Sequence, residues 1–190
     1  MKRKPSATSI LLLSVALLGM SGAAFSDDDK SGFFSRMFAG GKAPGVAPVE
    51  NPQYLEECGS CHFPYQPGLL PARSWTKVMA GLENHFDENA ELSAEDAKVL
   101  TDYLVKNAAD HANYKRSKKI MKSLRPDDAP LRAIETPYFI KKHNELSRKM
   151  VQDNPKVGSL SNCDACHTKA STGSFSESQI LIPGFGGWEK

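Results

Sequence analysis

Cys58–His62, CGSCH, and Cys163–His167, CDACH, are two copies of one C-x-x-C-H pattern in a chain of 190 residues. Together they contain all four cysteines of the chain. The pattern is typical of covalent haem attachment, because two thiols reach the two vinyl groups of one porphyrin and the next residue offers an imidazole to the iron. The sequence therefore predicts two haem c groups, attached through Cys58, Cys61, Cys163 and Cys166, with His62 and His167 as proximal ligands.

Other uses of four cysteines exist. Two disulfides, a redox-active dithiol or part of a zinc site would each fit a C-x-x-C pair in some setting. None of them accounts for a histidine directly after the second cysteine, twice over. Haem attachment explains both cysteine pairs and both histidines.

The sixth position on each iron decides between electron transfer and ligand chemistry, and three further histidines are available. Helical periodicity predicts a helix over 74–86, with His85 on its apolar side, and a second over 136–150, with His143 on its apolar side. We therefore expect His85 and His143 to be the distal ligands. The simplest pairing is local in sequence, His85 with the first haem and His143 with the second, although a crossed pairing stays open.

The remaining candidates are less well placed. His111 follows a helix end and precedes a basic run, so it is expected on the surface. Four methionines follow the first 26 residues, and Met121 is the main rival for the first haem; the set is Met37, Met79, Met121 and Met150. No histidine or methionine follows His167, so the second haem must take any such distal ligand from upstream.

Residues 1–26 have the pattern of a secretory signal peptide. Three cations precede an apolar run, and Ala24-Phe25-Ser26 offers small residues before a cleavage after Ser26. Export to the periplasm is the expectation, with no stable membrane insertion after cleavage. Removing the three cations takes the formal net charge from +2 to −1.

The rest of the chain is expected to fold mainly as α-helix, in two small haem-binding lobes of cytochrome c type packed around two covalent haems, with irregular N- and C-terminal segments. Further helices are expected over 51–62 and 93–108, and the apolar run 180–183 is expected to cover the second haem. The predicted organisation is a flexible leader over 27–50, a first lobe over 51–112 and a second lobe over 113–190.

Charge is uneven along the chain. Residues 83–96 contain six carboxylates, and residues 115–125 contain six cations. Both segments are interpreted as solvated helix faces or as patches that steer charged redox partners. A near-neutral exported protein is a poor candidate for binding nucleic acid.

Longer phrases around the motifs resemble the small dihaem cytochrome c family over residues 50–185. The phrases are YLEECGSCH (54–62), LLPARSW (69–75), NHF (84–86), NAAD (107–110), ETPYF (135–139) and NCDACH (162–167). The resemblance implies a periplasmic, all-helical electron carrier with two bis-histidine haems, and its matching positions are His62, His85, His143 and His167. Some members of that family are paired with a small oxygen-binding monohaem cytochrome and with a membrane b-type cytochrome.

The expected function is passive electron transfer between redox partners in the periplasm, by transient electrostatic docking, without enzymatic activity. The alternative is a dihaem enzyme such as a peroxidase, or a ligand-binding or sensor protein with one open iron. These classes differ in whether every iron is capped by the protein.

Overall fold

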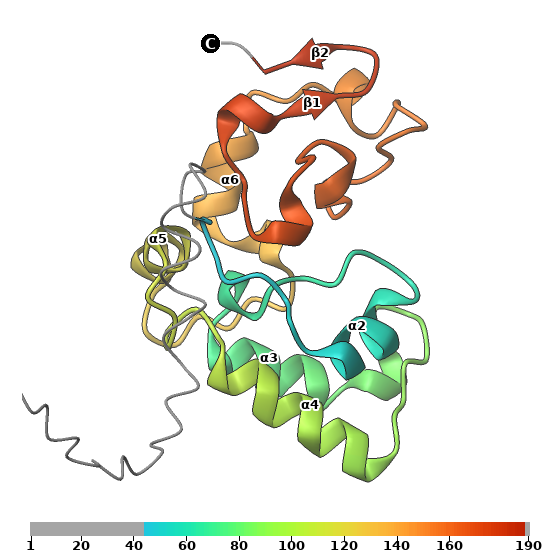
Figure 1. Ribbon diagram of the computed structural model, residues 1–190, viewed down its shortest axis with the longest axis vertical. Helices are drawn as coiled ribbons and strands as arrows, with labels where there is room; N and C mark the ends of the chain where they lie inside the picture. The colour runs from blue at the N-terminus through green and yellow to red at the C-terminus, as the bar shows by residue number, and fades with distance from the viewer. Residues whose placement is uncertain (1–43, 189–190) are drawn as a thin grey trace, which may run out of the picture. The chain divides into compact units, whose positions relative to one another are not determined.

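The computed structural model of the chain describes residues 44–188 (Figure 1). The predicted signal peptide, its cleavage site after Ser26 and most of the predicted leader therefore lie outside the described residues.

The described chain is mainly helical, as the sequence predicts. Its α-helices are α2 Pro52–Gly59, α3 Ala72–Met79, α4 Ala94–Lys106, α5 Lys115–Ser123 and α6 Pro137–His143. Short 3₁₀ turns lie at Pro67–Leu69, Leu82–Asn84, Ala133–Glu135, Arg148–Met150, Cys163–Ala165, Ala170–Thr172 and Glu177–Gln179. The strands among residues 44–188 are two-residue segments, β1 Leu181–Ile182 and β2 Gly186–Gly187, paired antiparallel. In this part of the chain no helix combines the length and apolar character that crossing a bilayer requires.

Side-chain caps set where three of the helices begin. A helix leaves its first N–H groups without partners inside the helix, and a polar side chain just before it can accept from one of them. This is done by Asn51 for α2, Ser93 for α4 and Thr136 for α6. The helices expected from residues 51, 93 and 136 therefore begin at these caps.

Three helices are shorter than predicted. The helix expected over 74–86 ends at Met79, the one expected over 136–150 ends at His143, and the one expected over 51–62 ends at Gly59. After α3 the backbone N–H of Gly81 bonds back to the carbonyl of Val78, a tightened last turn. The apolar spacing continues past these ends, but the chain turns there.

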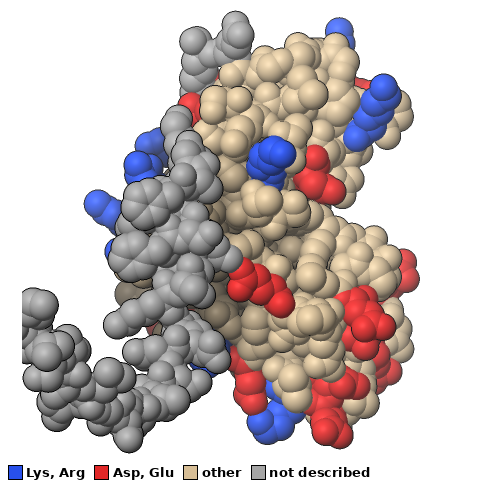
Figure 2. Space-filling model, in the orientation of Figure 1, with Lys and Arg blue, Asp and Glu red and all other residues tan. Residues whose placement is uncertain are grey.

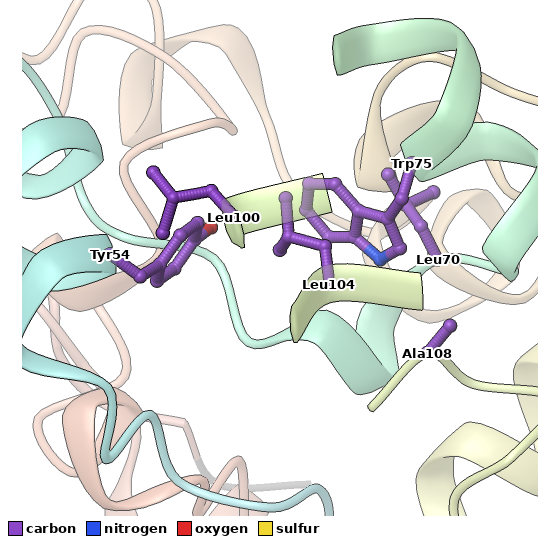
Figure 3. Packing of buried hydrophobic residues seen from close by; sticks show 6 residues of the cluster. All are labelled: Tyr54, Leu70, Trp75, Leu100, Leu104 and Ala108. Carbon is purple, nitrogen blue, oxygen red and sulfur yellow. The ribbon is translucent and has the colours of Figure 1, made fainter. Parts of the chain in front are cut away.

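The first hydrophobic cluster lies between α2, α3 and α4. Its buried members are Tyr54, Leu70, Trp75, Leu100, Leu104 and Ala108. Leu100 of α4 lies beside the Tyr54 ring, and Leu104 lies beside the Trp75 ring (Figure 3). Both rings also satisfy their polar atoms, because the Tyr54 hydroxyl donates to a carbonyl at 2.8 Å and the Trp75 indole N–H does the same at 2.8 Å.

The second cluster brings together residues that are far apart in sequence: Val46, Leu69, Ile120, Ala170 and Phe175. Val46 is fully buried, and the backbone N–H of Gly45 donates to the carbonyl of Gly173 at 2.9 Å. Residues 44–50, which the sequence assigns to a flexible leader, are therefore part of the packed structure.

The segment around the first motif also contacts the second half of the chain. Gln66 donates through its side chain to the Ala170 carbonyl at 2.6 Å, and the Ser117 hydroxyl donates to the Gly68 carbonyl at 2.8 Å. The division between lobes at 112 and 113 stays a prediction.

Candidate haem-binding sites

The first C-x-x-C-H segment lies where α2 ends. Cys58 is half-buried in the last turn of the helix, whereas Cys61 and His62 are exposed. Nδ1 of His62 lies 2.8 Å from the carbonyl oxygen of Phe63. A carbonyl can only accept, so Nδ1 carries the proton and Nε2 keeps the lone pair that a metal requires.

A tight reverse turn presents His85 to this site. The backbone N–H of His85 donates to the Glu88 carbonyl at 2.7 Å, and Glu88 returns the bond at 3.3 Å. Inside the turn, Phe86 and Asp87 have φ of 57° and 78°. Left-handed backbone at two successive non-glycine residues is costly, and such strain concentrates at functional sites.

The second motif begins on the 3₁₀ turn Cys163–Ala165, and further turns follow it up to Ala170. The backbone N–H of His167 donates to the Cys163 carbonyl at 2.8 Å, and that of Leu181 in β1 donates to the Cys166 carbonyl at 2.9 Å. The ring of Phe175 packs edge-on against His167 at 5.2 Å between centroids. Nδ1 of His167 is buried and has no hydrogen-bond partner among the described residues.

His143 is the last residue of α6. Its Nδ1 lies 2.9 Å from the Phe139 carbonyl one turn earlier, so this nitrogen carries the proton and Nε2 keeps its lone pair. The Phe139 ring stacks on the imidazole at 3.7 Å with an interplanar angle of 11°. Both contacts fix the direction of the His143 ring.

The four histidines form two pairs. The ring centroids of His62 and His85 are 6.1 Å apart with planes at 17°, and those of His143 and His167 are 6.1 Å apart with planes at 70°. Metal bonds of about 2 Å to each imidazole put the two ligating nitrogens about 4 Å apart and the ring centres about 6 Å apart. The separations therefore suit one metal ion between each pair, in the sequence-local pairing.

The second pair lines one cavity, and His85 of the first pair lines another. The larger, of about 850 Å³, is lined by the second motif and by His143, together with Tyr138 and Phe175. Ile180 and Ile182 also line it, so the apolar run at 180–183 covers this site as predicted. A smaller cavity of about 300 Å³ is lined by His85, Phe86 and Arg132. The larger volume lies in the range of cofactor pockets, roughly 300–1,000 Å³.

Arg116 of α5 ties the two sides of the second site together. Its guanidinium donates to the Tyr138 hydroxyl at 3.1 Å and to the Phe175 carbonyl at 2.7 Å. It also lies 5.8 Å from the Tyr138 ring and 5.4 Å from the Phe175 ring. Tyr138 belongs to the helix that carries His143, and Phe175 packs on His167, so one side chain braces the supports of both imidazoles.

Burial and charge keep these imidazoles neutral. Burial lowers the pKa of His167 to about 4, with further contributions from His143 and Arg116. Burial is also the main reason why the pKa of His143 is lowered. For His85 the cause is again burial, and His62 and Arg132 add to it. Neutral imidazole is the form that ligates a metal.

Burial favours the protonated form of two of the cysteine thiols. Burial raises the pKa of the Cys58 thiol to about 11 and that of Cys163 to about 12. All four cysteines lie among the described residues, and there they form no disulfide. A redox dithiol requires a lowered thiol pKa. The geometry and the pKa directions therefore fit thiols used for covalent attachment better than redox-active thiols.

The other ligand candidates lie elsewhere. His111 is exposed, as expected. Met79 packs against the first hydrophobic cluster. Among residues 44–188, no methionine is part of the lining of either cavity, and Met37 lies outside the described residues.

Comparison with known proteins identifies the family of the chain. The sequence profile of the dihaem cytochrome c family matches residues 54–175. The chain belongs to the dihaem cytochrome c family. Dihaem cytochromes of this family carry two covalent haem c groups, and the two C-x-x-C-H segments supply the cysteines for them. The family is one of electron-transfer cytochromes.

Solved dihaem cytochromes have the same fold. The X-ray structure of a diheme cytochrome c from Shewanella baltica OS155 is 42% identical, with a TM-score of 0.62, over 74% of this chain and 99% of that one. A diheme cytochrome c from Rhodobacter sphaeroides is 44% identical, with a TM-score of 0.61, over 68% and 100%. A search of curated proteins gave no match.

Sequence reasoning did not identify the residues that support the dihaem site. In the sequence, Arg116 is one cation of the basic run 115–125, and no motif marks Phe139 or Phe175 as site residues. The one available signal was position, because Phe139 lies one helical turn before His143. Residues 45–46 gave no signal at all, because their role depends on contacts across more than a hundred residues.

Proposed function

We propose that this protein is an electron carrier in which its own histidines cap both haem irons. The observation that carries the proposal is the pair of imidazole separations, each 6.1 Å between ring centroids. An iron with two protein ligands leaves no position for a substrate, so it changes oxidation state without binding one.

The proposed attachment sites are Cys58 and Cys61 for the first haem, and Cys163 and Cys166 for the second. The proposed axial pairs are His62 with His85 and His143 with His167. The protonated Nδ1 atoms of His62 and His143 support this assignment, because they direct Nε2 toward the metal. The haem itself supplies the redox chemistry, whereas these residues fix its position and the number of free sites on the iron.

Carbon monoxide tests the proposal directly. The optical spectrum of the reduced, purified holoprotein should be the same before and after the gas is added, because both irons are capped. A change in about half of the haem would mean one open iron. The carrier hypothesis would then give way to peroxidase or ligand-binding chemistry.

Single substitutions test the ligand assignment. His85→Ala and His143→Ala should each make one of the two haems reactive toward carbon monoxide. The exposed His111 provides a matched control, and His111→Ala should leave the spectrum unchanged. If both ligand variants stayed unreactive, the assignment of the distal histidines would be wrong.

We further propose that the protein acts in the periplasm after cleavage at Ser26, and that it exchanges electrons with other redox proteins by transient docking. The motifs that carry the family resemblance make a membrane b-type cytochrome and a small monohaem cytochrome the first partners to test. N-terminal sequencing of protein purified from the periplasmic fraction should begin at Asp27. Recovery of chain starting at Met1 would contradict the cleavage.

A further inference from the structure

The outward side of α5 is strongly cationic. Its exposed side chains include four lysines, Lys115, Lys118, Lys119 and Lys122, and the segment contains no Asp or Glu. Ser117 and Ile120 are buried on the opposite side. Exposed Lys141 and Lys142 of α6, which packs against α5, extend the charge. These six lysines are called the cationic face.

Repulsion between the lysines of the cationic face destabilises helix α5. Lys115 with Lys119 and Lys118 with Lys122 are like-charged pairs one helical turn apart, which destabilise a helix by about 0.2–0.5 kcal/mol each. Within residues 44–188, Lys142 alone among the six has a carboxylate ion partner, Glu177 at 2.9 Å. Most of the positive charge is therefore available to a molecule outside the chain.

The face surrounds the second candidate haem site. Lys115, Lys119, Lys141 and Lys142 line the same cavity as Cys163, Cys166, His143 and His167. Lys118 and Lys122 are not among the lining residues, so their charge adds to the outer surface beside that cavity.

The chain around His85 is rich in carboxylates, although Lys77 and Arg132 also line the smaller cavity. Residues 78–97, which include His85, contain six carboxylates and no lysine or arginine. Figure 2 shows Asp and Glu side chains gathering over α2 and the start of α4, whereas Lys and Arg side chains appear at the edge beside α5. Exposed carboxylates are therefore most frequent in the segment that contains His85, whereas the lysines of the cationic face lie at the second site.

We propose that the cationic face is the docking surface for an acidic one-electron redox protein, which exchanges its electron with the second haem. This inference rests on the proposed electron-carrier function, and it adds the surface at which the partner docks and the class of protein that docks there. In the forward step one electron leaves the reduced partner and converts the second haem from the ferric to the ferrous state, with no bond made or broken. Opposite charges on the two surfaces raise the rate of encounter and orient the partner toward that haem.

The test is stopped-flow reduction of the oxidised holoprotein by a reduced flavodoxin, an acidic one-electron donor. Lys118→Glu/Lys122→Glu should lower the second-order rate constant about tenfold at an ionic strength of about 20 mM, and the difference should disappear near 0.5 M. Lys98→Glu on α4 makes the same kind of charge change on an exposed lysine away from the face, and it should change the rate less than about twofold.

The inference is overturned if the double variant reacts like the wild type at low ionic strength, or if Lys98→Glu slows the reaction as much per charge. Each variant is also reduced with dithionite and exposed to carbon monoxide. Full reduction without a carbon monoxide response, combined with charge-independent kinetics, would reject the docking surface and leave the carrier function intact. A carbon monoxide response in the wild type would reject the carrier function itself.

Discussion

Replacing Arg116 by glutamine should lower the reduction potential of one haem and leave the other nearly unchanged. The guanidinium is held between the rings of Tyr138 and Phe175 by two hydrogen bonds, so its charge has a fixed place beside the second site. It already disfavours protonation of His143 and His167. The same field disfavours the ferric haem, which carries one more positive charge than the ferrous haem.

The magnitude follows from the ring contacts. The guanidinium lies 5.4 Å from the Phe175 ring, which lies 5.2 Å from the His167 ring. A charge on the order of 10 Å from the iron, at an effective dielectric constant of about 20, contributes about 1.7 kcal/mol. This corresponds to about 70 mV in a one-electron couple. Solvent screens a partly exposed guanidinium, so a decrease of about 30–70 mV is expected.

Spectroelectrochemical titration of the holoprotein measures both couples at once. Arg116→Lys keeps the charge and should retain most of the potential, even though it loses the two-pronged hydrogen bonding. Arg132 lies 3.7 Å over the Phe86 ring beside the first site, but it is exposed and paired with Glu135. Arg132→Gln should therefore shift the other couple, and by less. Equal shifts in the glutamine and lysine variants of Arg116 would refute the electrostatic reasoning and leave only a packing role.

Further predictions concern packing and ligand orientation. Gly173→Ala should destabilise the holoprotein by about 2 kcal/mol or more, because φ is +74° and an added Cβ would collide with the Val46 carbonyl. Gly184→Ala, at φ +79° in open space, should cost only about 1 kcal/mol. Denaturant unfolding of both variants measures the difference. Leu104→Ala should cost about 2–5 kcal/mol, and Val99→Ala on the exposed side of the same helix should stay within about 1 kcal/mol, also measured by denaturant unfolding. Low-temperature electron paramagnetic resonance should show two distinct low-spin ferric species. Imidazole planes at 17° interact with the same iron d orbital, whereas planes at 70° interact with two different d orbitals. A single species would contradict the two ring geometries.

The sequence predicts the chemistry of the sites better than the shape of the chain around them. The spacing within C-x-x-C-H is fixed by the porphyrin, so both motifs could be recognised without a fold. The helix starts at 93 and 136 are confirmed, because each depends on a local side-chain cap, Ser93 or Thr136. The helix ends near His85 and His143 are not, because the apolar period continues beyond Met79 to His85, and beyond His143 to residue 150, whether or not the backbone stays helical.

The chain turns at His85 through a local backbone conformation that the apolar periodicity of the sequence does not indicate. The Phe86 and Asp87 backbone adopts left-handed angles that neither residue favours, and the Asn84 side chain accepts from the Asp87 N–H at 3.2 Å. A glycine at either position would have signalled the turn in the sequence. Its absence made the segment resemble the continuation of a helix.

The second site differs from the first in how far along the chain its supports lie. The motif at 58–62 and the turn that presents His85 are close in sequence. Around His143 and His167, by contrast, the supports include Arg116, the C-terminal run at 180–183 and residues 45–46, held by the bond from Gly45 to Gly173. Local elements form with little loss of loop entropy, whereas long-range ones form only with the whole fold. Partial unfolding should therefore separate the axial histidines of the second haem before those of the first. In the Gly173→Ala variant, carbon monoxide should then bind to about half of the haem at temperatures below the main unfolding transition.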